Sequence, residues 1–180
     1  MSKKVLIIST SLRSGSNTEV LAKECLRGAQ DAGLDAEFVS LKGKALNFCI
    51  GCLSCQTTGA CAIKDDAAEI MAKVENAETV VFATPIYYYE MSGQMKTLLD
   101  RLNPLYPTDY AFRNIYLIAA AAEDGEHTFD EAYDGLQGWV DCFEKATLAG
   151  KVTCGGADAP NTAAAHTDAM KKAYELGKNL

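Results

Sequence analysis

The sequence has few of the features that mark a membrane, secreted or nucleic-acid-binding protein. No hydrophobic run approaches the length of a membrane span, and the N-terminus, Met1-Ser2-Lys3-Lys4, lacks the layout of a signal peptide. No basic cluster offsets the net charge of −7, which argues against nucleic acid as a partner. We therefore expect a cytoplasmic protein that binds neither membrane nor nucleic acid.

The signatures of hydrolytic and nucleotide-binding sites are also absent. Neither of the two histidines has an evident partner in sequence, so no catalytic triad is indicated. Neither G-x-x-x-x-G-K-[ST] nor G-x-G-x-x-G occurs, which argues against a nucleoside triphosphate or dinucleotide pyrophosphate site. The chain has 180 residues, of which 48% are hydrophobic, and this length and composition are typical of one globular domain with a substantial core.

Short apolar segments alternate with amphipathic ones along the chain. We expect strands over 5–9, 36–41, 79–84, 114–121 and 151–155, and helices over 17–32, 66–76, 93–103, 129–149 and 162–178. This alternation predicts an α/β fold with a five-stranded parallel sheet in the doubly wound order 2-1-3-4-5. The loops after strands one, three and four would then share a crevice at the carboxyl ends of the strands. We expect one domain over 1–180, with a cysteine-rich loop inserted at about 42–64.

The loop after the first expected strand is rich in hydroxyl groups. Residues 9–18 contain six Ser or Thr residues and Arg13, and Ser16 with Glu19 forms a capping-box pattern at the start of the next helix. Hydroxyls, free backbone amides, a positive helix end and a guanidinium together bind phosphate, and a single phosphate monoester fits this loop best. The alternative is a hydrophilic turn before a capped helix.

Three consecutive tyrosines, Tyr87 to Tyr89, follow the third expected strand, which we expect to end at Pro85. Their rings either pack against a neighbouring helix or flank a planar aromatic ligand in the crevice. We favour the ligand, because a triple run directly after a buried strand is harder to explain as core.

Further along the chain, Asp100 and Arg101 are interpreted as an ion pair at the end of the following helix.

Together, these loops resemble those of the NADPH-dependent FMN reductase and iron–sulfur flavoprotein group of flavodoxin-like proteins. The group's pattern is G-S-x-R-x-x-G-N-T after strand one and S-P-x-Y…K-x-x-x-D-R after strand three, matched here at 11–18, 85–87 and 96–101. The resemblance implies a flavodoxin-like three-layer sandwich that binds FMN. It implies that the FMN phosphate is held by Ser11, Arg13, Ser16, Asn17 and Thr18. The resemblance also implies that the isoalloxazine ring of FMN is surrounded by five residues: Pro85, Ile86, Tyr87, Tyr88 and Ser92.

The resemblance also implies an enzyme that passes electrons from NAD(P)H through FMN to a small acceptor, such as a quinone, nitroaromatic, flavin or metal. No protein acid or base is then obligatory, because the flavin supplies the chemistry. An acidic stretch, Ala121 to Glu126, stands where many relatives have a Gly-rich flavin contact, so the contribution of that loop is open. A homodimer or homotetramer is the assembly that the resemblance implies.

Four of the seven cysteines form the pattern C-x2-C-x2-C-x5-C at Cys49, Cys52, Cys55 and Cys61. Closely spaced thiolates hold a soft metal or an iron–sulfur cluster, whereas structural zinc usually draws on two separated pairs. An empty or disulfide-forming loop is the main rival. The resemblance favours a [4Fe-4S] cluster, and with it an alternative function: an electron-transfer module that passes single electrons between ferredoxin, the cluster and FMN.

Overall fold

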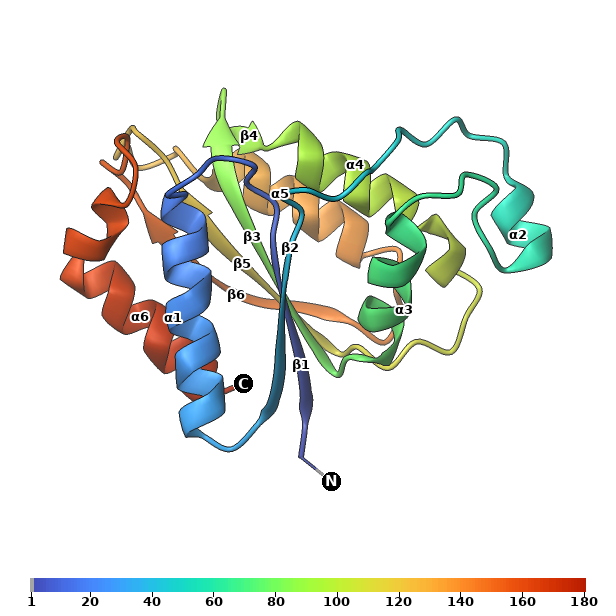
Figure 1. Cartoon of the computed structure of the whole chain (residues 1–180), viewed down its shortest axis with the longest axis horizontal. Coiled ribbons are helices and arrows are strands. Elements are labelled where there is room, and N and C mark those ends of the chain that lie inside the picture. Colours follow the sequence, from blue (N-terminus) through green and yellow to red (C-terminus); the bar gives the residue numbers. More distant parts are fainter. Residues whose placement is uncertain (1) are drawn as a thin grey trace.

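The computed structural model describes residues 2–180 as three layers, with a twisted sheet between two layers of helices (Figure 1). The strands are β1 (Lys4–Ser9), β2 (Asp35–Ser40), β3 (Thr79–Tyr87), β4 (Glu90–Met91), β5 (Asn114–Ala120) and β6 (Thr147–Cys154). The α-helices are α1 (Asn17–Asp31), α2 (Ser54–Thr58), α3 (Ala67–Asn76), α4 (Gly93–Arg101), α5 (Asp130–Val140) and α6 (Thr167–Lys178). Two 3₁₀ helices complete the set, η1 (Asn103–Leu105) and η2 (Thr162–Ala165).

The sheet order is β2-β1-β3-β5-β6, and β4 pairs only with β3. Counted over the five parallel strands, this is the predicted order 2-1-3-4-5, so the fold prediction is confirmed.

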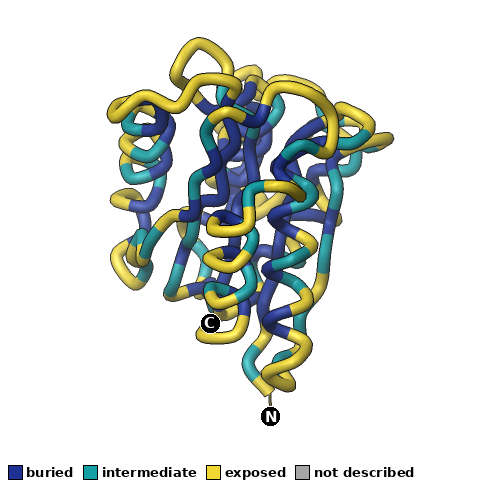
Figure 2. Tube along the Cα trace, turned by 90° about the vertical axis from the view of Figure 1, so that its left-hand side faces the viewer, coloured by how far each residue is buried: buried dark blue, intermediate teal, exposed yellow. Residues whose placement is uncertain are grey.

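The interior strand β1 is apolar on both of its faces because helices cover both sides of the sheet. Val5, Leu6, Ile7 and Ile8 are all nearly inaccessible to solvent, and the buried strands form the centre of the molecule in Figure 2. Helices α1 and α6 cover one face of the sheet, while α3, α4 and α5 cover the other (Figure 1). No helix within residues 2–180 has the length and hydrophobicity needed to cross a membrane.

The predicted boundaries are wrong at three places. Helix α5 ends at Val140, and β6 begins at Thr147, because residues from Thr147 onward pair with β5. Strand β3 continues through Pro85 to Tyr87, since its last two residues pair with the short strand β4. The last predicted helix is divided at His166, whose backbone is not helical, into η2 and α6.

Helices α1 and α6 approach each other at two glycines. A Cβ atom at Gly177 would lie 1.8 Å from the carbonyl oxygen of Cys25, and one at Gly28 would lie 2.1 Å from that of Tyr174. Neither position leaves space for a side chain, because the obstructing atoms belong to the backbone of the facing helix. This contact holds the two helices of one layer together.

Replacing Gly177 by alanine is expected to lower the free energy of unfolding by about 1–3 kcal/mol, because the helices must separate to admit the methyl group. Gly138 in α5 is the matched control, since a Cβ atom there would meet no atom from another element within 4 Å. Its replacement by alanine should raise the free energy of unfolding by about 0.5–1 kcal/mol. Urea unfolding followed by circular dichroism measures both, and equal effects would contradict the close helix contact.

Candidate functional site

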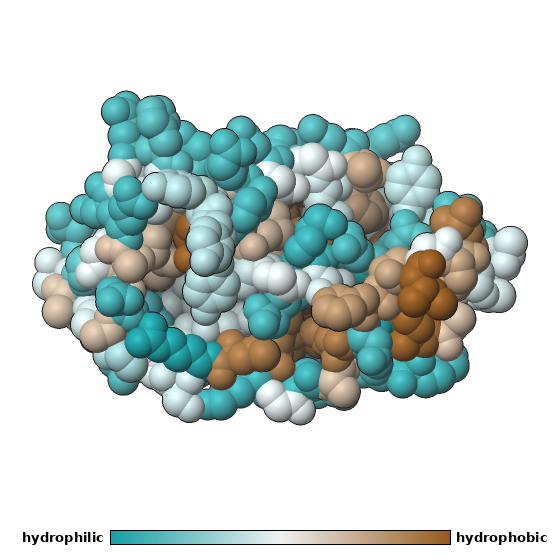
Figure 3. Space-filling view, turned by 90° about the horizontal axis from the view of Figure 1, so that it is seen from above, coloured by the Kyte–Doolittle hydropathy of each residue, from teal (hydrophilic) through white to brown (hydrophobic). Residues whose placement is uncertain are grey.

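A cavity of about 200 Å³ opens at the carboxyl ends of β1, β3 and β5. This edge of the sheet faces the viewer in Figure 3. In a doubly wound sheet, the crossing from β1 to β3 is where ligands bind. Eight of the ten residues expected to hold FMN line this cavity: Ser11, Arg13, Ser16, Asn17, Thr18, Pro85, Ile86 and Tyr87.

The other two expected residues, Ser92 and Tyr88, lie outside the cavity wall. Ser92 is fully buried, and its Oγ atom lies 3.2 Å from the hydroxyl oxygens of both Thr10 and Thr84. It also caps α4 by accepting a hydrogen bond from the Met95 amide at 3.3 Å. Ser92 therefore joins the loops after β1 and β3 from beneath, while Tyr88 is 99% exposed at the tip of the β3–β4 hairpin.

The hydroxyl-rich loop meets the N-terminus of α1. Ser16 Oγ accepts a hydrogen bond from the Glu19 amide at 3.3 Å, which confirms the predicted cap, but Glu19 pairs with Lys23 at 2.6 Å instead of completing the box. Thr18 Oγ1 lies 2.9 Å from Ser16 Oγ, and both side chains are buried at the cavity wall. The first-turn N–H groups of a helix lack partners within the helix and favour an anion, so this end of the cavity suits a phosphate.

Arg13 is the one basic side chain in the cavity wall. Its Nη1 atom donates to the carbonyl oxygen of Asp158 at 2.7 Å, which anchors the guanidinium beside the loop after β6. A guanidinium has five N–H donors, so this contact leaves others for an anionic ligand.

Asn17 uses its side chain to hold the protein together. Its Nδ2 atom donates to the carbonyl oxygens of Ala157 at 2.7 Å and Ala159 at 2.9 Å, and its Oδ1 atom accepts from the Ala163 amide at 3.0 Å. All three partners belong to the segment after β6. The side chain therefore positions this segment, and the Asn17 backbone in the first turn of α1 is the part left for a phosphate.

The segment after β6 also contributes Ala157 and Asp158 to the cavity wall, and the sequence analysis missed both. The available signal was Gly155-Gly156 directly after the last predicted strand, at the same carboxyl edge of the sheet. Ala120 to Ala122, from the loop after β5, complete the wall.

The tyrosine run forms a strained two-residue turn. Tyr88 and Tyr89 have φ angles of 53° and 68°, as both central positions of a type I′ hairpin turn require, although Asn-Gly is the usual sequence there. Positive φ is unfavourable for a bulky residue. The interaction of the Tyr89 hydroxyl with the Glu123 carboxylate raises the pKa of that hydroxyl, so the hairpin lies beside the loop after β5. The exposed rings thus stand beside the cavity to which Tyr87 contributes.

The four clustered cysteines line a second, smaller cavity together with Arg101 and Asn103. Cys49 and Cys52 are exposed, Cys61 is half-buried, Cys55 is buried, and all four are free thiols. Within residues 2–180, no three His, Cys, Asp or Glu side chains are arranged as the ligands of a single metal ion. In Figure 3 the hydrophobic side chains gather on the side of the molecule where this loop lies, in agreement with the exposure of Phe48, Ile50 and Leu53.

Arg101 ties this cysteine loop to α4. Its guanidinium donates to both carboxylate oxygens of Asp65, at 2.7 Å and 2.9 Å, and to the carbonyl oxygens of Asn47 and Ile63. Both charged side chains are buried, with exposed fractions of 0% and 2%. The hydrogen bonds from Arg101 hold the pKa of the Asp65 carboxyl well below its usual range.

One interpretation from the sequence is wrong at this point. Arg101 does not pair with Asp100, which instead contacts Lys96 at 2.7 Å, because adjacent helix residues point in different directions. At the start of α3, Asp66 is the N-cap residue, and the Oδ1 atom of the preceding Asp65 accepts a hydrogen bond from the Ala67 amide at 3.1 Å.

The N–H donors around the second cavity suit thiolate ligands. Asn103 Nδ2 donates to Cys55 Sγ at 3.1 Å, and the Nε atom of Arg101 is buried without a hydrogen-bond partner. Asp65 and, to a smaller extent, Cys61 raise the pKa of Arg101, which places the Cys61 thiol beside the guanidinium. N–H donors stabilise negative charge on sulfur. Four thiols around one cavity therefore fit an iron–sulfur cluster. The sulfur ligands of a cluster stand further apart than the ligands of a single metal ion, so the lack of a single-ion site among the described residues does not conflict with this fit.

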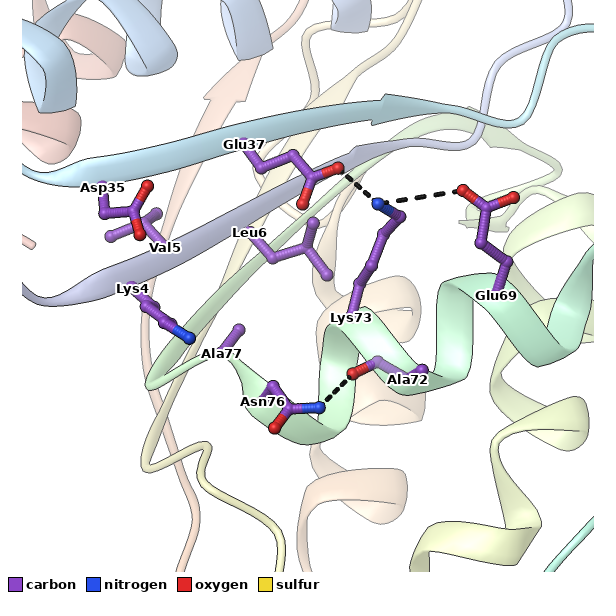
Figure 4. A pocket seen from close by; sticks show the side chains of 10 residues that line it. All are labelled: Lys4, Val5, Leu6, Asp35, Glu37, Glu69, Ala72, Lys73, Asn76 and Ala77. Carbon is purple, nitrogen blue, oxygen red and sulfur yellow. Dashed lines mark hydrogen bonds and ion pairs between the residues drawn. The ribbon is translucent and has the colours of Figure 1, made fainter.

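A cavity of about 420 Å³ lies elsewhere, between α3 and the first halves of β1 and β2 (Figure 4). Its central cation, Lys73, is already neutralised by Glu37 at 2.6 Å and Glu69 at 3.7 Å. The cavity is lined by the amino-terminal residues of β1, away from the carboxyl ends where doubly wound sheets bind ligands. It therefore carries no candidate site.

The sheet order and the cavity at its carboxyl edge define a protein of the flavodoxin-like α/β class. Residues 3–154 match the model of the NADPH-dependent FMN reductase family, and the chain therefore belongs to this family. This confirms the resemblance found in the loops.

Relatives with a named function agree with the family. The chain is 42% identical over 102 residues to an iron–sulfur flavoprotein of Methanocaldococcus jannaschii, covering 57% of this chain and 53% of that protein. It is 29% identical over 129 residues to a putative NAD(P)H-dependent FMN-containing oxidoreductase of Bacillus subtilis, covering 67% of this chain and 68% of that protein. The chain spans about half the length of the iron–sulfur flavoproteins that it matches.

Among solved structures, an NAD(P)H:quinone oxidoreductase from Methanothermobacter marburgensis superposes with a TM-score of 0.79 at 14% identity, covering 99% of this chain and 97% of that one. An archaeal flavodoxin superposes with a TM-score of 0.58 at 14% identity, covering 98% and 94%. At this identity the likeness shows the shared fold alone.

Proposed function

We propose that the chain is an FMN-binding oxidoreductase that transfers electrons from NAD(P)H to a small acceptor. The observation that carries this proposal is a cavity at the β1–β3 crossing that is lined both by the hydroxyl-rich start of α1 and by Tyr87. FMN, when bound, supplies the chemistry of accepting hydride and releasing electrons. Membership of the NADPH-dependent FMN reductase family supports both the cofactor and the electron donor.

In this proposal the protein binds and orients the cofactor. Ser11, Ser16, Thr18 and Arg13, with the N-terminus of α1, hold the phosphate. The segment from Pro85 to Tyr87 lines the isoalloxazine, with the backbone at its polar edge. The exposed rings of the hairpin offer a surface for a planar acceptor, which favours quinones, nitroaromatics and flavins.

A second candidate function is an iron–sulfur flavoprotein that exchanges single electrons with a donor such as ferredoxin. The specific observation behind it is the cavity that all four cysteines line, in which Asn103 donates a hydrogen bond to Cys55 and Arg101 forms part of the wall. Cys49, Cys52, Cys55 and Cys61 would hold the cluster, which supplies one-electron transfer when bound. Relatives named iron–sulfur flavoprotein support this candidate.

The two functions are separated by replacing the four loop cysteines with serine and purifying both proteins without oxygen. If the chain is an NAD(P)H oxidoreductase, NADH or NADPH should bleach the flavin absorbance of the wild type and of the quadruple variant alike. If it is an electron-transfer module, NAD(P)H should be a poor reductant, and reduced ferredoxin should bleach only the wild type. Cys142→Ser is the matched control, since Cys142 is exposed and lies outside the loop. A protein that takes up no FMN would contradict both functions.

A further inference from the structure

We propose that Asn103 is a positioning residue that raises the reduction potential of the cluster held by Cys49, Cys52, Cys55 and Cys61, acting through the Cys55 sulfur. This inference rests on the second candidate function, which supplies the cluster. It concerns a residue outside the cysteine loop that the sequence pattern does not single out.

The contact is direct and partly shielded from water. Asn103 Nδ2 lies 3.1 Å from Cys55 Sγ, and Cys55 is only 8% exposed while Asn103 is half-buried. A hydrogen bond in such surroundings is electrostatically stronger than one in water. Of the four cysteines, Cys55 is the most buried, so it is the ligand on which a protein dipole has the greatest effect.

The donor stands on a rigid part of the fold. Asn103 begins η1 directly after α4 and is followed by Pro104. The residues on either side of this pair, Leu102 and Leu105, are fully buried in the core, and the Leu105 amide donates to the Leu102 carbonyl at 2.9 Å. The Asn103 amide is therefore held by the core below the loop, and its position does not depend on the loop's own conformation.

The sign of the effect follows from the charge. Reduction adds one negative charge, which the cluster shares with its cysteine sulfurs, and an N–H group aimed at one of those sulfurs stabilises the added charge. Hydrogen bonds to the sulfurs are among the factors that set the potential of such clusters. Arg101, with its unpartnered Nε atom beside the loop, acts in the same direction. Its replacement would also leave Asp65 unpaired, so Asn103 is the residue to test.

The experiment is an anaerobic redox titration of the wild type, Asn103→Leu and Asn103→Asp. Electron paramagnetic resonance measures the fraction of reduced cluster at each potential. In Asn103→Leu, the ratio of reduced to oxidised cluster at a fixed potential should fall about tenfold, which is about 59 mV for a one-electron couple. Asn103→Asp keeps the size of the side chain, loses the N–H donors and adds negative charge, so its ratio should fall further. Resonance Raman spectra should also show a shifted iron–Cys sulfur stretch in both variants.

Asn76→Leu is the matched control, because Asn76 is exposed at the end of α3 and its amide donates to the Ala72 carbonyl, so the cluster potential of this variant should equal that of the wild type. An unchanged potential in an Asn103 variant with full iron and sulfide content would overturn this inference and leave the proposed cluster intact. A wild type that holds no iron or sulfide when purified without oxygen would instead reject the cluster itself.

Discussion

Replacing Asp65 by alanine should lower the free energy of unfolding by about 3–5 kcal/mol, because the change leaves the buried Arg101 guanidinium without its counter-ion. Asp65 also accepts hydrogen bonds from the amides of Asn47 and Ala67, so its loss frees the cysteine loop from both α3 and α4. Urea unfolding of the two proteins measures the difference, and the variant should also lose order in the loop.

A double variant, Asp65→Leu with Arg101→Met, should recover much of that stability, because apolar residues remove the buried charges together. Asp100→Ala is the matched control for loss of a carboxylate: the Asp100–Lys96 pair is exposed, and its loss should change the free energy of unfolding by no more than about 0.5 kcal/mol. Equal effects of the Asp65 and Asp100 changes would contradict a buried ion pair at Arg101.

The buried ion pair between Asp65 and Arg101 makes the free energy of unfolding depend on pH. The pKa of Asp65 is lowered in the folded protein, so its ionised form stabilises the fold wherever the pH exceeds the unfolded value of about 3.9. This contribution falls as the pH drops below about 4 and is lost as the pH passes through the folded-state pKa. Unfolding measured at pH 7 and at pH 3 should therefore show a smaller difference in Asp65→Ala than in the wild type.

The double substitution Arg13→Ala with Ser11→Ala should weaken FMN binding by about a hundredfold or more, because it removes a charge-assisted hydrogen bond and a hydroxyl from the phosphate end of the cavity. Neither Ser11 nor Arg13 caps a helix, so both side chains can be removed without loss of a helix cap. Ser16 is left unchanged because its side chain caps α1. Titration of flavin-free protein with FMN, followed by flavin fluorescence, measures the affinity.

Riboflavin is the matched probe, because it has the same ring system as FMN and no phosphate. The wild type should prefer FMN strongly, and the double variant should bind FMN and riboflavin with similar affinity. A variant that loses affinity for both flavins equally, or that binds FMN as the wild type does, would show that residues 11–18 do not hold the phosphate.

Much of the fold and of the flavin-site proposal can be predicted from the amino-acid sequence, because the signals are local. An apolar strand followed by hydroxyls and a helix cap, at Val5 to Glu19, predicts both a βα unit and an anion site. The alternation of strands and helices then leaves few sheet orders to choose from. The ends of the elements are less predictable, because Pro85 and Thr147 join strands through pairing partners far away in sequence.

The sequence by itself determined the family, the sheet order and eight of the residues that line the cavity at the carboxyl edge of the sheet. Only the tertiary structure decided how single polar groups pair: Arg101 with Asp65, Asn17 with the segment after β6, and Asn103 with Cys55. The physical reason is the range of the interactions. Strand, helix and cap preferences act between residues a few positions apart, whereas these hydrogen bonds join groups 36 to 146 positions apart. Such pairs form only where packing of the layers brings two buried polar groups together, and no local pattern records that.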